Sequence, residues 1–254
     1  MNDFPKIVHQ IWYQGEDQIP EKYHENMYKT KVTLRDYQYI IWDNDKIENF
    51  LRKQNKTILD KYKSYPHLHQ KVDFARYCIL YFMGGLYVDM DATVIKNPSF
   101  LQKRFPGFEV YVSKVDLYPH ESLLSNASWR TINNGIIYSQ KGSKFMENLI
   151  NQIPESMNIL PKVMDIQLTT GPLTFTRIAS NSEGVKILDP EYFEPCILTE
   201  CNKTKNTITV HKHEGSWYNS YITALSKIYV KYRHKITIGL LVLVIYLFFH
   251  FRRT

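Results

Sequence analysis

The chain has 254 residues, enough for one sizeable domain or one domain with a short appendage. Apolar residues make up 44% of it, which excludes an intrinsically disordered protein. The net charge of +7 is concentrated at one end, because six of the 32 Lys and Arg residues follow Glu214, the last acidic residue. The remaining 26 basic residues face 25 acidic ones. This near-neutral balance argues against a nucleic-acid partner.

The first quarter of the chain alternates between strand-like and helix-like segments. Residues 6–12, KIVHQIW, and 37–42, YQYIIW, are rich in β-branched and aromatic residues and predict strands. Residues 21–30 and 45–63 predict helices, the second because its apolar residues recur mostly at helical spacing. Strands and helices alternating at these lengths predict an α/β domain with a largely parallel sheet.

The best helix signal covers residues 70–83, which carry a broad apolar face. Asp73 and Arg76 are three residues apart, so their side chains project from one side of this helix. Gly84 suits a left-handed helix C-cap. Gly85 then allows a tight turn into the next strand.

That strand, residues 86–88, ends at an Asp-x-Asp motif formed by Asp89 and Asp91. Ligands of open α/β sheets bind beyond the carboxyl ends of strands, which is where this motif is expected. The spacing alone is not specific, because Asp43 and Asp45 share it and also follow a strand. For that second pair the expected role is helix N-capping.

The second half continues the alternation. We predict a strand within 131–138, a helix over 143–153, another helix with Pro172 in its first turn, and a last strand over 207–211. No repeat or low-complexity linker interrupts the chain. One domain over 1–222 is therefore expected.

The three cysteines show no zinc-site spacing. Cys78 lies in the apolar helix and is expected in the core. Cys196 and Cys201 could form a small loop disulfide in an oxidising compartment.

The C-terminal tail predicts a membrane anchor. Residues 223–235 form a basic juxtamembrane segment, and residues 236–251, ITIGLLVLVIYLFFHF, are almost continuously apolar. As a helix this run reaches roughly 24 Å, slightly short of a ~30 Å hydrocarbon core. Lys235 and Arg252 at its ends could snorkel to cover the difference. The expected protein is therefore single-pass.

Three motifs together resemble a known family. They are the HQIW of the first strand, the pattern D-x-x-R-x-x-x-L-x-x-x-G-G-x-Y-x-D-x-D that starts at Asp73, and a terminal histidine segment ending in Ser216-Trp217. This set is similar to the DXD glycosyltransferases related to yeast initiating α-1,6-mannosyltransferase and inositol-phosphorylceramide mannosyltransferases. The resemblance covers most of the domain. It implies a GT-A fold and retaining sugar transfer from a nucleotide diphosphate donor.

The resemblance also implies roles for individual residues. Asp89 and Asp91 match the pair that binds Mn²⁺ or Mg²⁺ and the donor diphosphate, and are catalytic candidates. Asn134 lies in an asparagine turn near where the donor and acceptor sugars meet, or is simply part of a tight turn. His211 and His213 are both metal-ligand candidates, with His211 preferred by register.

The donor-binding candidates surround the motif. Asp73 and Arg76 match a pair that contacts the donor sugar and diphosphate, and an aromatic at the end of the first strand would stack on the base. The full set is Trp12, Asp73, Arg76, Gly85, Tyr87, Ser216 and Trp217.

The implied reaction is transfer of a hexose, with mannose favoured, to a glycan or a sphingolipid-type acceptor. GDP-mannose is the favoured donor, with a UDP-sugar possible, and the Golgi or endoplasmic reticulum is the favoured location. The side of the membrane is open. The positive-inside rule and the lack of a signal peptide favour a cytosolic domain, whereas the resemblance favours a lumenal one.

Two other functions use the same residues. The segment LYVDMDATV also fits the first motif of haloacid-dehalogenase phosphatases, with Asp89 as nucleophile and Asp91 as general acid. That chemistry requires a later acidic pair, and no DD or DxxxD follows Asp91. The other alternative is a catalytically inactive, membrane-tethered sugar-binding subunit.

Overall fold

The computed structural model describes residues 4–115, 131–157, 159–197, 200–213 and 232. All but the last lie in one compact unit, Met1–Glu214. No helix within these ranges is long and apolar enough to cross a membrane. The predicted span 236–251 lies outside the described residues, as do Ser216, Trp217 and, apart from Tyr232, the juxtamembrane segment.

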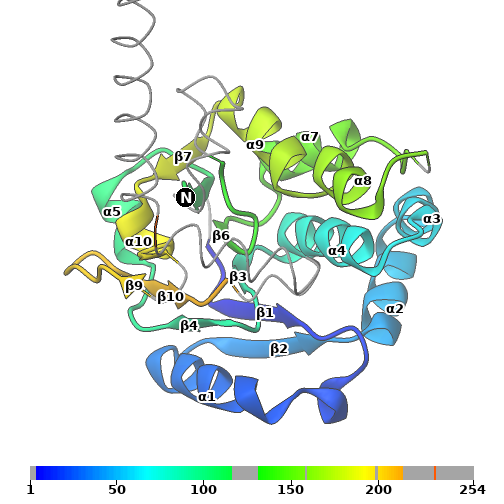
Figure 1. The fold of residues 1–254 in the computed structure, drawn as a ribbon. Helices are drawn as coiled ribbons and strands as arrows, with labels where there is room; N and C mark the ends of the chain where they lie inside the picture. Colours follow the sequence, from blue (N-terminus) through cyan, green and yellow to red (C-terminus); the bar gives the residue numbers. More distant parts are fainter. Residues whose placement is uncertain (1–3, 116–130, 158, 198–199, 214–231, 233–254) are drawn as a thin grey trace, which may run out of the picture. The chain divides into compact units, whose positions relative to one another are not determined.

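A six-stranded sheet in the order β2-β1-β3-β6-β5-β7 forms the centre of the unit (Figure 1). Its strands are β1 Ile7–Ile11, β2 Gln38–Trp42, β3 Gly85–Val88, β5 Val110–Ser113, β6 Ile136–Ser139 and β7 Val185–Leu188. The pairs β1–β2, β1–β3 and β5–β7 are parallel, whereas β6 runs antiparallel to both β3 and β5. The predicted α/β class and the largely parallel sheet are therefore confirmed, with one strand reversed.

Two short ladders lie outside this sheet: β4 Ala92–Val94 pairs with β10 Thr209–His211, and β8 Cys196–Ile197 pairs with β9 Glu200–Cys201. The helices are α1 His24–Thr33, α2 Asn44–Gln54, α3 Lys56–Ser64, α4 Leu68–Met83, α5 Phe100–Arg104, α7 Lys144–Gln152, α8 Lys162–Thr169, α9 Pro172–Ser180 and α10 Pro190–Phe193. Two single 3-10 turns, η1 Glu16–Gln18 and η2 Glu21–Tyr23, precede α1.

Both faces of the sheet are buried, because successive side chains of a strand point to opposite faces. On β3, Tyr87 packs in a core with α4, α7 and α9, whereas Leu86 and Val88 pack in a second core with Tyr192 and Phe193 of α10. The unit is thus layered, with the sheet between two hydrophobic cores.

The single helix predicted over 45–63 is wrong, since the segment forms two helices. Asn55 adopts an extended backbone between them, and its side chain accepts hydrogen bonds from the amides of Thr57 and Ile58. Because an N-cap residue has a non-helical backbone, Asn55 ends α2 as well as starting α3. The capping role expected for Asp43 is confirmed, because its carboxylate accepts a hydrogen bond from the Lys46 amide.

The turn from α4 into β3 requires two glycines. Gly84 and Gly85 have φ of +67° and +101°, a region that favours glycine. A Cβ on Gly85 would also lie 2.5 Å from the carbonyl oxygen of Ile7. The glycine pair therefore allows β3 to begin directly after α4 and to lie close to β1. Gly85 was predicted to bind donor; a Cβ on it would meet Ile7 and His9 of β1, and its backbone pairs with Ser139 of β6.

The cysteines follow the sequence interpretation. Cys78 is buried in α4, and Cys196 and Cys201 form a disulfide that closes the β8–β9 hairpin.

Candidate active site

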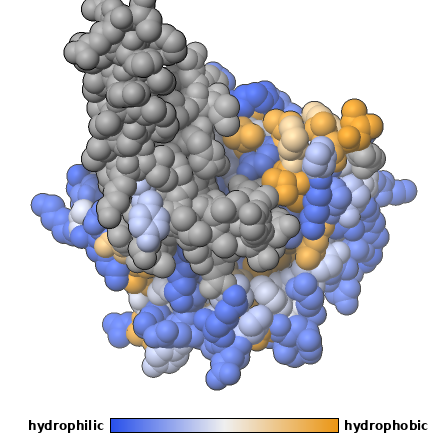
Figure 2. Space-filling model, viewed as in Figure 1, coloured by the Kyte–Doolittle hydropathy of each residue, from blue (hydrophilic) through white to orange (hydrophobic). Residues whose placement is uncertain are grey.

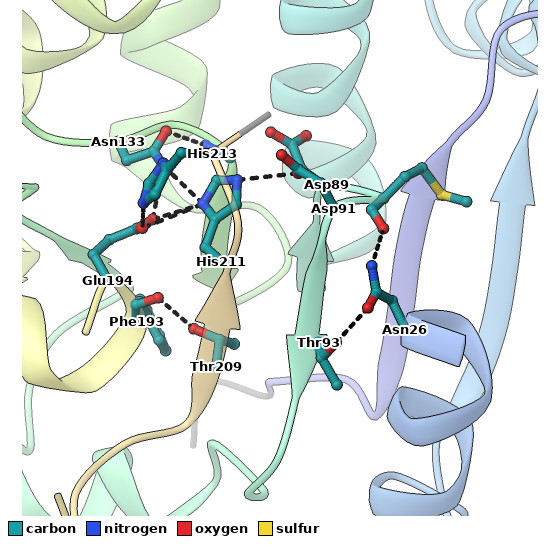
Figure 3. A network of polar contacts seen from close by, with 12 residues as sticks. Asn26, Asp89, Asp91, Thr93, Asn133, Phe193, Glu194, Thr209, His211 and His213 are labelled. Atoms are coloured by element: carbon teal, nitrogen blue, oxygen red, sulfur yellow. Dashed lines mark hydrogen bonds and ion pairs between the residues drawn. The ribbon is translucent and has the colours of Figure 1, made fainter. Parts of the chain in front are cut away.

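The Asp-x-Asp motif lies at the carboxyl end of β3, where three segments meet. Asp89 follows the last residue of β3, and its amide donates to the carbonyl of Gly135 at 2.9 Å. The antiparallel ladder between β4 and β10 then pairs His211 with Ala92, next to Asp91 (Figure 3). Residues more than 100 positions apart are thereby brought into contact.

Arg76 is the central cation of this site. Its Nη2 lies 3.3 Å from Asp73 Oδ1 and 3.2 Å from Asp89 Oδ1, and its Nη1 donates to the Asn134 carbonyl at 2.6 Å. The guanidinium also lies 4.5 Å from the ring centre of Tyr87. Burial opposes the charge, but Asp89, Tyr87 and Asp73 raise the pKa of Arg76 above its ordinary value. Arg76 is thus held as a buried cation.

The second carboxylate on α4, Asp73, is buried on the same side. Burial raises its pKa to about 7, with the nearby Asp89 adding to the rise and Arg76 opposing it. Its oxygens accept hydrogen bonds from Asn134 Nδ2 at 3.0 Å and from Thr170 Oγ1 at 3.3 Å. The predicted pair of Asp73 and Arg76 therefore faces inward, and Asn134 contacts it directly.

Asp89, Asp91 and His211 form a group that fits a divalent cation. One ligand atom from each lies within 4.8 Å of the others. Asp89 Oδ1 already accepts a hydrogen bond from Tyr87 Oη at 2.8 Å, whereas Asp89 Oδ2 faces Gly135, where a Cβ would lie 2.5 Å away. Carboxylate oxygens such as those of Asp89 and Asp91 are the ligands that Mn²⁺ and Mg²⁺ prefer.

His211 has partners on both ring nitrogens. Nε2 lies 3.1 Å from Asp91 Oδ1, and Nδ1 lies 3.2 Å from each oxygen of Glu194. Burial disfavours a charged imidazole, but Asp91 and Glu194 raise the pKa of His211 well above its ordinary value. Although burial also opposes ionisation of Glu194, His211 and His213 lower its pKa to about 2.

Glu194 is the member of the site that the sequence did not reveal. It follows α10, its side chain is 1% exposed, and it also accepts a hydrogen bond from Asn133 Nδ2 at 2.7 Å. His213 Nε2 lies 2.8 Å from Glu194 Oε2 without forming a well-directed hydrogen bond. Only the fold brings this carboxylate to the histidines, because nothing in its local sequence marks it.

The two histidines have different partners in the structure. The rings of His211 and His213 stack with centres 4.0 Å apart, and His213 contacts Glu194. The group with the two motif aspartates includes His211, while His213 belongs to a group with Glu194 and His211. This geometry favours His211 as the ligand next to the Asp-x-Asp motif.

The aromatic candidates lie at two depths. Tyr87 is buried, with its hydroxyl on Asp89. Trp12 follows β1, is partly buried, and donates from Nε1 to the Gln18 carbonyl at 3.0 Å. Its ring centre lies 5.6 Å from that of Tyr23. The donor-stacking role of Trp12 remains a prediction.

Comparison with known proteins gives the family. Residues 20–116 match the family described as "Glycosyltransferase sugar-binding region containing DXD motif". An uncharacterized glycosyltransferase of Acanthamoeba polyphaga mimivirus is 31% identical over 230 residues, which cover 84% of this chain and 83% of the relative. Inositol phosphoceramide mannosyltransferase 3 of Schizosaccharomyces pombe is 26% identical over 219 residues, 85% of this chain.

The match covers 56% of the fission yeast protein, so the chain spans little more than half of that relative's length. Among solved structures, the galactosyltransferase LgtC, crystallised with donor and acceptor sugar analogs, matches with a TM-score of 0.46 and 11% identity, over 88% of this chain and 94% of that one. With the viral relative matched over most of both chains, the resemblance drawn from the motifs is confirmed: this chain belongs to the family of DXD-containing glycosyltransferases and is a transferase with an α/β fold.

Proposed function

We propose that the protein is a metal-dependent, retaining hexosyltransferase, with mannose as the favoured sugar, that uses a nucleotide diphosphate donor. The observation that carries this proposal is the convergence of Asp89, Asp91 and His211 beside the buried Arg76. The family membership supplies the reaction class.

The charge balance of the site supports a divalent cation. Asp73, Asp89, Asp91 and Glu194 face one guanidinium and two imidazoles within a largely buried region. Buried carboxylates in excess of their partners are costly unless a cation compensates them. Mn²⁺ or Mg²⁺ held by Asp89, Asp91 and His211 would act as a Lewis acid that stabilises the charge on the departing diphosphate.

The side chains around this position have distinct tasks. Arg76 fixes one oxygen of Asp89 and adds a positive charge near the diphosphate. Asp73 offers a carboxylate oxygen to a hydroxyl of the donor sugar, and Asn134 holds that carboxylate in place. No described side chain is positioned as an evident nucleophile, which suits a front-side reaction in which the diphosphate assists the acceptor hydroxyl.

The names of the relatives support a choice of donor and acceptor. Inositol phosphoceramide mannosyltransferase 3 names a mannosyl transfer to a sphingolipid. By extension, GDP-mannose is the favoured donor here, a UDP-sugar is the second choice, and a glycan or sphingolipid-type acceptor at a Golgi or endoplasmic reticulum membrane completes the proposal. The apolar segment 236–251 would hold the site at that membrane. The phosphatase alternative has no support from the family comparison.

The test is a panel of nucleotide sugars incubated with the full chain and Mn²⁺, with release of the free nucleoside diphosphate as the readout. We expect slow hydrolysis of GDP-mannose that excess chelator removes. Binding of donor and Mn²⁺ without any turnover or transfer would instead support the inactive sugar-binding subunit. Equal turnover with and without chelator would contradict metal dependence.

A further inference from the structure

Five large hydrophobic side chains are exposed on and around α8, a part of the molecule that the proposed reaction does not use. Figure 2 shows hydrophobic surface gathered where Figure 1 places α8 and α9. The exposed fraction is 94% for Ile159 and at least 38% for each of the other four side chains. We call this set the apolar ridge: Met157, Ile159, Met164, Leu168 and Leu173.

The ridge is one structural unit. Met164 and Leu168 are four residues apart on α8 and therefore lie on one side of it. The preceding loop is tied to α8 because the buried Asp165 accepts hydrogen bonds from the Met157 amide at 2.8 Å and from Ser156 Oγ at 2.5 Å. The Leu173 amide at the start of α9 donates to the side chain of Gln167 at 3.3 Å.

The exposed charges beside the ridge are mostly basic. Lys162 on α8 and Arg177 on α9 are exposed. Over 155–177 the acidic residues are Asp165, which is fully buried, and Glu155, which is exposed two positions before Met157. Exposed apolar side chains flanked by basic ones match the boundary between lipid acyl chains and anionic headgroups. This pattern favours one binding partner for the surface, a membrane that contains anionic lipid.

The ridge is also joined to the active site. Thr170 directly follows α8; its hydroxyl donates to Asp73 Oδ2 at 3.3 Å, and its carbonyl accepts a hydrogen bond from Tyr77 Oη at 2.8 Å. A membrane touching Leu168 would therefore lie close to the segment that contacts Asp73. Leu168 and Thr170 are two residues apart, so one short chain segment connects the apolar ridge to the active site.

We propose that the apolar ridge is a membrane-contact surface, which lays α8 on an anionic bilayer and presents a lipid-linked acceptor to the site beside Asp73. The part of this proposal that concerns the acceptor rests on the proposed function. The membrane contact itself rests only on the ridge and its flanking charges.

The test places a fluorescent label on the ridge in the full chain. Met164→Cys and Val32→Cys each introduce one exposed thiol, since Cys78 is buried and the other two cysteines form a disulfide. Val32 is 57% exposed and serves as the matched control. It belongs to α1, which lies at the bottom of Figure 1, away from α8. The proteins are reconstituted in vesicles of phosphatidylcholine and phosphatidylserine that contain a spin-labelled lipid.

We expect the spin-labelled lipid to quench the label at position 164 strongly and the label at position 32 little or not at all. Equal quenching at both positions, or no quenching at position 164, would overturn the membrane contact. A label at 164 that becomes shielded by raising the protein concentration without vesicles would show a second copy on the ridge, which also overturns it.

A second pair of variants separates this inference from the proposed function. Leu168→Glu should lower transfer to a vesicle-embedded acceptor by about tenfold or more, since burial of one Leu side chain is worth that much in affinity. Hydrolysis of the soluble donor should stay unchanged, and Val32→Glu should change neither rate. If the unmodified chain hydrolysed no donor while the label at position 164 was still quenched, the result would contradict the proposed function but not the membrane contact. Unaltered vesicle transfer by Leu168→Glu would contradict the ridge.

Discussion

The carboxylate of Glu194 lies 3.2 Å from Nδ1 of His211, while Nε2 of the same ring lies 3.1 Å from Asp91. A histidine that ligates a metal commonly donates its other N–H to a carboxylate, which fixes the tautomer and the ring orientation. Asn133 holds Glu194 in turn, through a hydrogen bond of 2.7 Å. Glu194 is thus a positioning residue that keeps Nε2 of His211 directed at the aspartate motif.

Glu194→Gln is therefore expected to weaken Mn²⁺ binding by roughly 10- to 100-fold, the usual effect of altering a carboxylate behind a metal-bound histidine. The amide keeps the size of the side chain but removes the negative charge beside both histidines. Titration of Mn²⁺ followed by electron paramagnetic resonance measures the affinity without requiring turnover.

Glu191→Gln is the matched control, because Glu191 lies three residues earlier, is partly exposed, and accepts hydrogen bonds from Thr204 and Asn206 rather than contacting a histidine. Its Mn²⁺ affinity should equal that of the unmodified protein. If both variants bound Mn²⁺ equally well, Glu194 would have no role in positioning His211.

Gly135→Ala tests the space around the motif. The added methyl would lie 2.5 Å from Asp89 Oδ2 and 3.1 Å from His211 Cε1, so one of them must move. Asp89 is held at its other oxygen by Arg76 and Tyr87, which limits how it can adjust. We expect an overpacking cost of about 1–3 kcal/mol in unfolding free energy and a larger relative loss of Mn²⁺-dependent donor turnover. Turnover equal to that of the unmodified protein would show that Asp89 Oδ2 is not needed.

His9 provides a prediction about pH. It is fully buried in β1, accepts a hydrogen bond from Trp42 Nε1 at 3.1 Å, and contacts the Gly84 carbonyl at 2.8 Å. Burial lowers its pKa from 6.5 to about 4, opposed by the Gly84 carbonyl. The unfolded chain therefore binds this proton more readily, and the contribution of His9 to stability is complete above pH 6.5 and lost as the pH falls toward 4.

The loss attributable to His9 is about 1.4 kcal/mol per pH unit, or about 3 kcal/mol over this window. Urea unfolding at several pH values, compared between the unmodified protein and His9→Gln, measures it. The difference removes the titration of other groups, including Asp73, whose pKa burial raises to about 7. Parallel pH profiles for the two proteins would contradict a buried neutral His9.

The sequence predicted the parts of the site that lie in one continuous stretch. Asp73 and Arg76 share a helical face, Gly84 and Gly85 have positive φ, and Asp89 follows a buried strand, because short-range spacing determines all three. The break at Asn55 was not predicted, because the apolar spacing continues across it. The extended backbone there is stabilised by the hydrogen bonds that the Asn55 side chain accepts at the start of α3.

Contacts across the chain were harder to predict. β4 is only three residues long and was not predicted, yet its pairing with β10 places His211 beside Asp91. The same pairing settles the register, with His211 on the motif and His213 on Glu194. Glu194 itself lies between aromatic and proline residues with no motif around it. Its position depends on tertiary packing that one sequence does not encode locally.

The central claim is that Asp89 and Asp91 hold a cation for donor turnover, and Asp91→Asn tests it most directly. The measurement is Mn²⁺-dependent release of nucleoside diphosphate from GDP-mannose, with thermal unfolding run in parallel and Asp45→Asn as control. Asp45 belongs to the other Asp-x-Asp pair and is exposed at the start of α2. We predict that Asp91→Asn abolishes turnover while remaining folded, and that Asp45→Asn keeps full activity. Turnover in Asp91→Asn equal to that of the unmodified protein would contradict the account.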